Sequence, residues 1–448
     1  MKALLSQLGV NVIEDTNKLM IPTWKAWYSG YVKKEHDYTY YNGKKKIKCT
    51  RAQMRMAKKV CEDWANLLMN EKVEICVGNE TLSERVKHIM SYNRFRERAN
   101  QLVETTFALG TGAFVEFRDG DNINIDYVTA DKIFPISAEN GEITECAFCS
   151  EKRIGGKKHY YLNVHKKNDA GQYVVYNYLF DDQRKHTPLP EGVLDVVETK
   201  SDKPFFQIIR PNVTSNIDTD AVMGMSVFAN SLSVLKTIDI VFDSYQNEFI
   251  LGKKRIIVPL SMAQFLDKEG NIQPVFDADD VAFYGVPADG FEEMGLKEID
   301  MHLRASEHDA ALRQNLNLLS EGCGFGPNRY EFDRNGGLKT ATEVISEKTD
   351  LFRNLKKHEL VFARAIEDMV RAIIRLDGGS PDVDVDIDFD DSIIEDRKSE
   401  FSERLQLVTA GVSSRAEMRQ WYFNETEEQA KKVLATMPGN EELEITEE

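Results

Sequence analysis

The sequence predicts an α+β protein of more than one domain, and three observations carry this prediction. Short aromatic and β-branched runs separated by Gly, Asn and Asp fill residues 113–180, as in antiparallel hairpins. Apolar residues recur at steps of three and four from 226 to 251, which indicates a long amphipathic helix. The run from 341 to about 376 contains neither Gly nor Pro and predicts a second long helix.

The composition is typical of a globular protein. The chain has 448 residues, of which 42% are hydrophobic and 29% charged, enough for two or three domains with cores of their own. No window approaches the roughly 18 consecutive apolar residues of a membrane span, and the N-terminus lacks a secretory signal, so we expect a cytosolic chain without membrane association. Six scattered cysteines are expected to be reduced thiols.

The first third predicts helices followed by strands. A helix is expected over 51–70 and helical structure over 81–109, ending at Gly110-Thr111-Gly112. This glycine pair precedes a strand, whereas a phosphate-binding loop leads from a strand into a helix. We therefore interpret Gly110 as the end of a helix.

The middle of the chain predicts a small insert between two helices. The helix 226–251 stops at Gly252, strand signals follow at 255–259 and 279–286, and a returning helix is expected over 301–321. Five glycines and Pro327 then interrupt the chain between 322 and 339.

The next segments begin with a helix signal. Thr340-x-x-Glu343 is a capping box for the long helix, which at 1.5 Å per residue would measure on the order of 50 Å. A helix over about 394–410 and a second capping box, Ser414-x-x-Glu417, precede a last helix through Trp421.

Two groups of potential metal ligands have simpler explanations. Cys146 and Cys149 form the only close cysteine pair, and they have no second pair at zinc spacing. Aspartates alternate with apolar residues from Asp382 to Asp391, as in a half-buried strand, and the pattern fails as a calcium loop. A metal-dependent nucleic-acid enzyme that uses the carboxylates of Asp384, Asp386 and Asp388 remains an alternative.

Signatures of catalysis are missing from the sequence. It contains no Gly-x4-Gly-Lys-Ser/Thr phosphate loop, no Gly-x-Ser-x-Gly elbow and no His-Glu-x-x-His zinc motif. The net charge of −17 also disfavours general coating of nucleic acid. We expect a protein that is not an enzyme and needs no cofactor.

In the order of its segments, the chain resembles the portal proteins of tailed bacteriophages, of the siphophage type found in phages of Gram-positive hosts. The segments that carry the resemblance are IPTWKAWYSG, AKKVCEDWANLLMNEKVEI, TFALGTGAFVEF, GMSVFANSLSVLKTIDIVFDSYQNEFILGKKRIIVP, NGGLKTATEVISEK and DFDDSIIEDRKSEFSERLQLVTAGVSSRAEM. Each is weak alone, and their common order makes the resemblance specific.

The resemblance implies a ring, expected to be a dodecamer, around a channel for double-stranded DNA at one vertex of the capsid. It implies these parts: a wing over 1–223, stem helices over 224–251 and 301–321, a small α/β clip over 252–300, a tunnel loop over 322–339, a wing segment with the long helix and a strand over 340–395, and a helical crown over 396–448. The implied partners are the terminase large subunit, a head-completion or adaptor protein, and the major capsid and scaffolding proteins. The implied location is the virion, after assembly in the host cytoplasm.

The resemblance also assigns residues to the DNA path. Candidates on the tunnel loop are Gly322, Gly324, Gly326, Arg329, Arg334, Gly336, Gly337 and Lys339. Candidates at the entrance to the clip are Lys253, Lys254 and Arg255. A monomeric head-tail adaptor that only contacts a portal is a further alternative.

Overall fold

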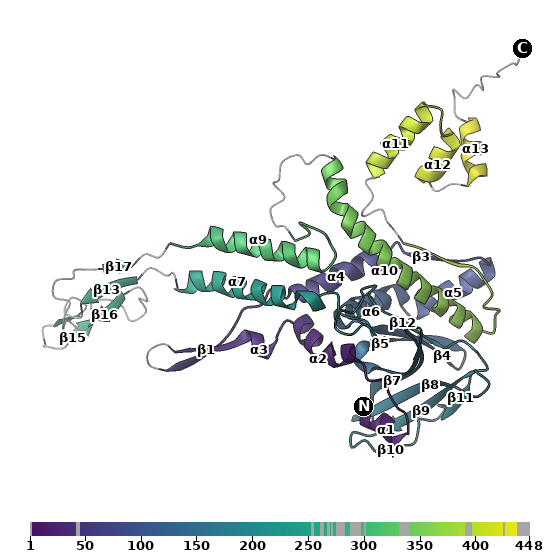
Figure 1. Ribbon diagram of the computed structural model, residues 1–448, viewed down its shortest axis with the longest axis horizontal. Helices are drawn as coiled ribbons and strands as arrows, with labels where there is room; N and C mark the ends of the chain where they lie inside the picture. Colours follow the sequence, from purple (N-terminus) through teal and green to yellow (C-terminus); the bar gives the residue numbers. More distant parts are fainter. Residues whose placement is uncertain are drawn as a thin grey trace, which may run out of the picture.

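The computed structural model describes most of the chain and has mixed helix and sheet, which confirms the α+β class (Figure 1). The described residues are 2–41, 45–251, 255–259, 264–266, 269, 272–274, 283–286, 297–299, 302–330, 341–389, 397–423 and 426–436.

The body of the molecule combines N-terminal helices with antiparallel sheets. The helices are α1 (Lys2–Gln7), α2 (Thr16–Ser29), α3 (Lys33–His36), α4 (Met56–Leu68), α5 (Glu80–Tyr92) and α6 (Phe95–Leu109). A three-stranded sheet has the order β12 (Phe206–Ile209), β4 (Gly112–Asp119), β5 (Asn122–Thr129). Its central strand β4 follows directly from α6, so the helix packs on the sheet that it leads into.

A larger sheet forms the outer edge of the body. Its strand order is β10 (His186–Thr187), β9 (Tyr173–Phe180), β8 (Lys157–Lys167), β7 (Glu142–Ile154), β6 (Ile133–Glu139), with β11 (Val196–Glu198) paired to β9. Two-stranded ladders join β1 (Asp37–Tyr41) to β2 (Lys46–Thr50) and β18 (Val385–Asp388) to β3 (Glu74–Val77). The main core fills the space between the helices and β4, and a smaller core lies under α1.

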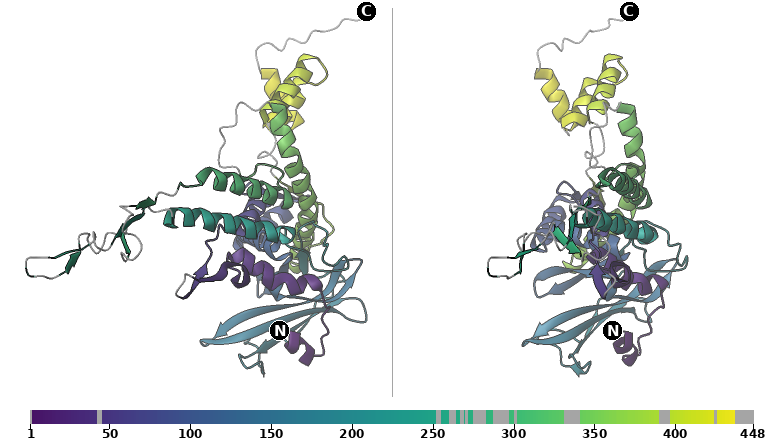
Figure 2. Two further views of the ribbon diagram at one scale, coloured as in Figure 1. Left: turned by 60° about the vertical axis from the view of Figure 1, so that its left-hand side comes forward. Right: turned by 90° about the vertical axis from the view of Figure 1, so that its left-hand side faces the viewer.

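A helical hairpin projects from this body. It consists of α7 (Leu232–Leu251) and α9 (Ala305–Gly322), which pack side by side, and Figures 1 and 2 show both extending away from the sheets. Strands lie at its far end: β13 (Arg255–Pro259), β14 (Gln264–Leu266), β15 (Ile272–Pro274), β16 (Phe283–Val286) and β17 (Lys297–Ile299). β13 pairs in parallel with β16 and antiparallel with β17, so the expected strands at 255–259 and 283–286 are neighbours.

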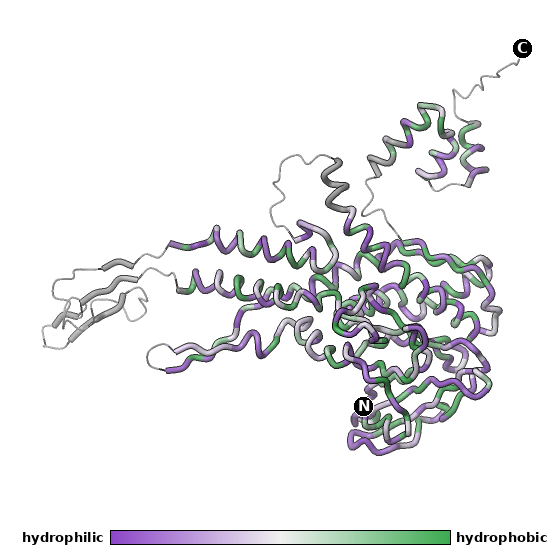
Figure 3. The backbone as a smooth tube through the Cα atoms, viewed as in Figure 1, coloured by the Kyte–Doolittle hydropathy of each residue, from purple (hydrophilic) through white to green (hydrophobic). Residues whose placement is uncertain are grey.

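The longest helix, α10 (Ala341–Leu376), crosses the body. Figure 3 shows apolar and polar residues alternating along it, and its C-terminal half buries Phe362, Ile366, Met369 and Ile373 in the main core. The capping box at its start falls on Thr340, outside the described residues. Three short helices follow beyond the upper end of α10 in Figure 1: α11 (Arg397–Thr409), α12 (Arg415–Phe423) and α13 (Glu427–Thr436).

Two helix boundaries differ from the sequence pattern, each because of hydrogen bonds between a side chain and the backbone of a distant segment. α4 starts at Met56, since Asp239 and Asp243 on α7 accept hydrogen bonds from the backbone N–H groups of Met54 and Ala52. The expected helical run 81–109 breaks at Asn93, whose amide donates to the Ile123 carbonyl and whose side-chain oxygen accepts from the Ile125 N–H.

Two of the expected helix-capping signals are confirmed, and one further signal was missed. Gly110 ends α6 in the left-handed conformation at φ 84°, as expected. The Ser414 hydroxyl accepts a hydrogen bond from the Glu417 N–H at 3.1 Å, and the Glu417 carboxylate accepts one from the Ser414 N–H at 2.9 Å. These two bonds confirm the second capping box. The sequence analysis missed α13, although Thr426 and Gln429 form a third box before it.

Candidate functional site

The glycine-rich segment after α9 begins with a tightly held turn. We call Cys323–Tyr330 the anchored turn. The Trp64 indole N–H on α4 donates to the Cys323 carbonyl at 3.0 Å, and the Asn354 amide on α10 donates to the Gly324 carbonyl at 2.9 Å. The turn therefore joins the end of the hairpin to two helices of the body.

An aromatic cluster holds the anchored turn from inside. The Phe325 ring is 2% exposed and stacks on Trp64 with ring centroids 4.6 Å apart. Trp64 in turn stacks on Phe107 and meets the His358 ring edge-on. Such contacts are worth about 0.5–1.5 kcal/mol each beyond the burial of apolar area, so the turn is fixed by packing as well as by hydrogen bonds.

His358 is a neutral member of this cluster. Its Nδ1 accepts a hydrogen bond from the Asn212 N–H at 3.0 Å, which links α10 to the segment after β12. Burial, assisted by the positive charge of Lys357, lowers the pKa of His358 to about 3. The imidazole thus serves as an acceptor and an aromatic ring, and it carries no charge at neutral pH.

The predicted loop residues divide into two groups. Gly322 is the last residue of α9, where an added Cβ would lie 2.5 Å from the Ser231 hydroxyl. Gly324 and Gly326 have φ values of 85° and 73° within the anchored turn. Arg329 lies over the Phe325 ring, and its guanidinium is 3.7 Å from the Asp63 carboxylate on α4. The structure therefore brings these four residues together at the base of the hairpin.

The five glycines suggest backbone freedom throughout the expected tunnel loop, 322–339, yet its first part is packed against the body. Residues 323–330 pack against α4 and α10, because Phe325 gains more from the aromatic cluster than from solvent. Arg334, Gly336, Gly337 and Lys339 lie outside the described residues, as do Lys253 and Lys254. Arg255 begins β13, where its backbone pairs with Ile299. Their assignment to a DNA path stays a prediction.

Two carboxylates that were not among the candidate residues fix the base of the hairpin: Asp239, which is buried, and Asp243, which is partly buried. The Asp239 carboxylate, 7% exposed, lies 2.9 Å from His36 Nε2 and accepts from the Met54 N–H at 2.8 Å. Asp243, one turn further along α7, accepts from the Ala52 N–H at 3.0 Å. The spacing of four residues puts both aspartates on one face of the helix, a signal that was available in the sequence.

A second polar contact joins α7 and α9 near the far end. The Arg304 Nε donates to Glu248 at 2.9 Å, and the His308 Nε2 is 3.5 Å from the same carboxylate. The hydrogen bond from Arg304 lowers the pKa of Glu248. The contact links the last turn of α7 to the start of α9, so it helps to set the register of the two helices.

In the part of the chain that the structure describes, both groups of potential metal ligands lie in or beside strands. Cys146 and Cys149 lie three residues apart on β7 and so point to opposite faces, one into the main core and one into the smaller core. Burial raises the pKa of both thiols to about 12. In β18, Val385 is buried while Asp386 and Asp388 are exposed, as expected of a half-buried strand. Within the described part of the chain, no three His, Cys, Asp or Glu side chains are grouped to hold a metal ion.

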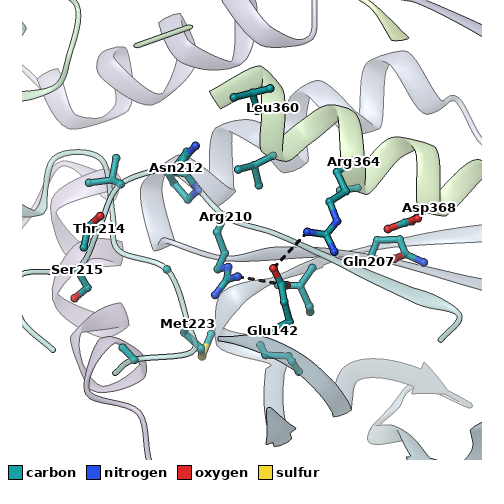
Figure 4. A pocket seen from close by; sticks show the side chains of 18 of the residues that line it. Glu142, Gln207, Arg210, Asn212, Thr214, Ser215, Met223, Leu360, Arg364 and Asp368 are labelled. Carbon is teal, nitrogen blue, oxygen red and sulfur yellow. Dashed lines mark ion pairs between the residues drawn. The ribbon is translucent and has the colours of Figure 1, made fainter. Parts of the chain in front are cut away.

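A hollow of about 510 Å³ opens between α10, β12 and the segment 210–224 (Figure 4). Arg210 and Arg364 both approach Glu142 at its edge, at 3.5 Å and 3.9 Å. The Arg210 guanidinium also donates to the Val222 carbonyl at 2.7 Å. These charges are engaged with one another at the edge of the hollow.

Two further observations bear on the class of protein. Among the helices that the structure describes, none is long and apolar enough to span a bilayer. The family model for phage portal proteins of the SPP1 Gp6-like type matches residues 12–441, which is almost the entire chain. No curated protein matches the chain significantly.

Proposed function

The chain belongs to the SPP1 Gp6-like family of phage portal proteins, and from this premise we propose that copies of it form a ring-shaped channel at one vertex of the capsid. Double-stranded DNA would pass through this channel during packaging and ejection. The terminase large subunit and the head-tail connector proteins would dock on it in turn, and the ring would become part of the virion beside the major capsid and scaffolding proteins.

The projecting helical hairpin is the observation that best supports this function. α7 and α9 leave the body together and carry strands at their far end, so a docking surface is held away from the core (Figures 1 and 2). Carboxylates outnumber lysines and arginines in both helices. A channel lined by such helices repels the phosphate backbone, and DNA slides because few phosphates are neutralised.

The parts of the chain take roles in this proposal according to their positions. The body with α10 is the wing, the hairpin is the stem, the segment 252–300 is the clip for docking, and α11–α13 are a small crown. In this proposal the anchored turn is the start of the tunnel loop, and the rest of that loop follows Tyr330 in the sequence. Arg334 and Lys339 would then meet DNA, with Lys253, Lys254 and Arg255 at the clip entrance.

The first test is the state of the purified full-length chain. Negative-stain electron microscopy with a mass measurement in solution should show annular particles of about twelve subunits with an axial hole wide enough for a duplex. A ring too narrow for DNA, or a species that remains monomeric at every salt concentration, would favour the head-tail adaptor instead.

The second test concerns the tunnel loop. The variant Arg334→Ala with Lys339→Ala should form rings of unchanged mass but package less DNA, because its cations no longer guide the duplex. Lys157→Ala, at the exposed end of β8, is the matched control and should package normally. Normal packaging by the double variant would contradict the role of the loop.

A further inference from the structure

The long helix α10 presents one stripe of residues that the described part of the chain leaves exposed. Arg353, Lys357, Leu360 and Arg364 follow one another at steps of four, three and four, and all four are exposed. These steps keep them on one face of the helix. We call this stripe the Leu360 ridge.

The leucine at its centre is unusual for this helix. Leu360 is 72% exposed, whereas Leu355 and Phe362 on the same helix are 2% and 0% exposed. Single exposed leucines are common on protein surfaces, so exposure alone proves nothing. The surroundings of Leu360 are what distinguish it.

A hollow lies on each side of the leucine. Leu360 lines the hollow of about 510 Å³ together with Asn212 and Arg364 (Figure 4). It also lines a second hollow of about 350 Å³, whose other walls include Ala363, Ile387 and Phe389. A projecting apolar side chain between two hollows has the shape of a protein–protein contact surface. In such a contact the partner's side chains fill the hollows and cover the projecting side chain.

The charge of the ridge indicates which partner it fits. Arg353 is 3.7 Å from Asp350 and Arg364 is 3.9 Å from Glu142, and both are exposed ion pairs that hold their cations weakly. The exposed positions of the ridge are therefore basic, while the whole chain has a net charge of −17. A second copy of this chain carries the opposite net charge, so its acidic surface can attract the basic ridge.

We infer that the Leu360 ridge is one half of the contact between neighbouring copies of this chain. This inference rests on the proposed ring, because a ridge on one copy must meet a different face of the next. Such head-to-tail contacts close into rings when the rotation between copies divides a full turn. The facing surface on the next copy is acidic around an apolar centre that receives Leu360.

The experiment compares three full-length proteins by sedimentation velocity and mass photometry. Leu360→Glu places a carboxylate at the centre of the contact and opposite an acidic face. It should raise the protein concentration needed for half-assembly by at least about tenfold, which corresponds to about 1.4 kcal/mol per tenfold change. Glu is a good helix former, so the circular dichroism and the melting temperature of the subunit should stay unchanged.

Leu194→Glu is the matched control, because Leu194 is 66% exposed but lines neither hollow. It should assemble like the wild type. Assembly of Leu360→Glu at the wild-type concentration would overturn the inference and leave the proposed function standing. A wild-type chain without any ring would contradict both. A fall in the melting temperature of the Leu360→Glu monomer with normal assembly would show that this chain's own segment covers the ridge, which also overturns the inference.

Discussion

At the scale of single residues, the most consequential groups are ionisable side chains buried without charge. Glu116 on β4 is 2% exposed. Burial raises its pKa to about 8, and the neighbouring Gln207 amide offsets this only in part. The Glu116 carboxyl is therefore protonated at neutral pH. As the pH rises, it loses this proton and becomes a charge buried in the core.

The sign of this effect predicts a stabilising substitution. A carboxyl with a raised pKa stabilises the fold fully below its unfolded pKa of about 4.3, and this stabilisation is lost as the pH rises through 8. Glu116→Gln should remove the loss and increase the free energy of unfolding, by roughly 2–4 kcal/mol more at pH 8 than at pH 5. Urea unfolding at the two pH values measures the difference. Glu198→Gln, on the exposed strand β11, should show no such dependence.

His358 predicts the opposite dependence. Its pKa of about 3 lies below the usual value near 6.5, so its stabilising contribution is present above pH 6.5 and is lost as the pH falls toward 3. His358→Gln should lower stability at pH 7.5, because the edge-on contact of the imidazole with Trp64 is lost. The same variant should flatten the decline between pH 6 and pH 4. If the stability of His358→Gln declines as steeply as that of the wild type, other groups control acid unfolding. His186→Gln, at an exposed histidine, is the control variant for this comparison.

At the scale of elements, two backbone segments cross with no room for a side chain. An added Cβ on Gly110 would lie 2.2 Å from the Gly224 carbonyl oxygen, and one on Gly224 would lie 2.1 Å from the Gly110 oxygen. The crossing holds the end of α6 against the segment that leads to α7. It therefore sets where the hairpin leaves the body.

Gly224→Ala should consequently destabilise the fold by roughly 2–4 kcal/mol, since backbone atoms cannot move aside as a flexible side chain would. Gly120→Ala is the control: an added Cβ on Gly120 meets nothing within 4 Å, although Gly120, unlike Gly224, has a positive φ of 60°. It should cost only about 1–2 kcal/mol of left-handed strain. Equal unfolding midpoints for the two variants in urea would refute the crossing as a packing constraint.

The elements also show what the sequence could predict. The pattern of α10 was clear from its apolar spacing, and the end of α6 from Gly110, because both signals are local. The break at Asn93 and the late start of α4 were missed, because their hydrogen-bond partners, Ile125 and Asp239, lie far along the chain. The anchored turn was missed for the same reason: its glycines suggested freedom, while Phe325 and Trp64 decide its position.

At the scale of the whole molecule, charge and shape point to the same role. The chain has a net charge of −17, and the hairpin that carries the far strands is itself acidic. Among the residues described, cations near the base of the hairpin are engaged, as Arg329 is with Asp63. A protein that grips DNA neutralises many phosphates, and this surface provides for few.

The proposed ring of wild-type chains should therefore not retain duplex DNA. In a fluorescence anisotropy titration with a 30-base-pair duplex at about 100 mM salt, we expect a Kd weaker than the roughly 10⁻⁴–10⁻⁶ M of ordinary non-specific DNA-binding proteins. Glu307→Lys with Asp309→Lys, at exposed positions of α9, should create binding if the hairpin lines the channel. The affinity of this double variant for DNA should fall as the salt concentration rises. The slope of the logarithm of the association constant against the logarithm of the salt concentration should steepen by about 0.9 for each phosphate contacted.

The control is the same change of charge at exposed positions of the body, Asp169→Lys with Glu191→Lys. It distinguishes DNA binding by the hairpin from DNA binding by any surface that has gained positive charge. If both double variants bind DNA equally, the hairpin has no special place on the DNA path. If the wild type already binds tightly, or cleaves the duplex when a divalent metal is added, the nucleic-acid enzyme returns as the better explanation, and Asp386→Ala would test its carboxylates. Binding by the hairpin variant alone requires that DNA and α9 meet, which a channel provides and an external docking surface for proteins does not.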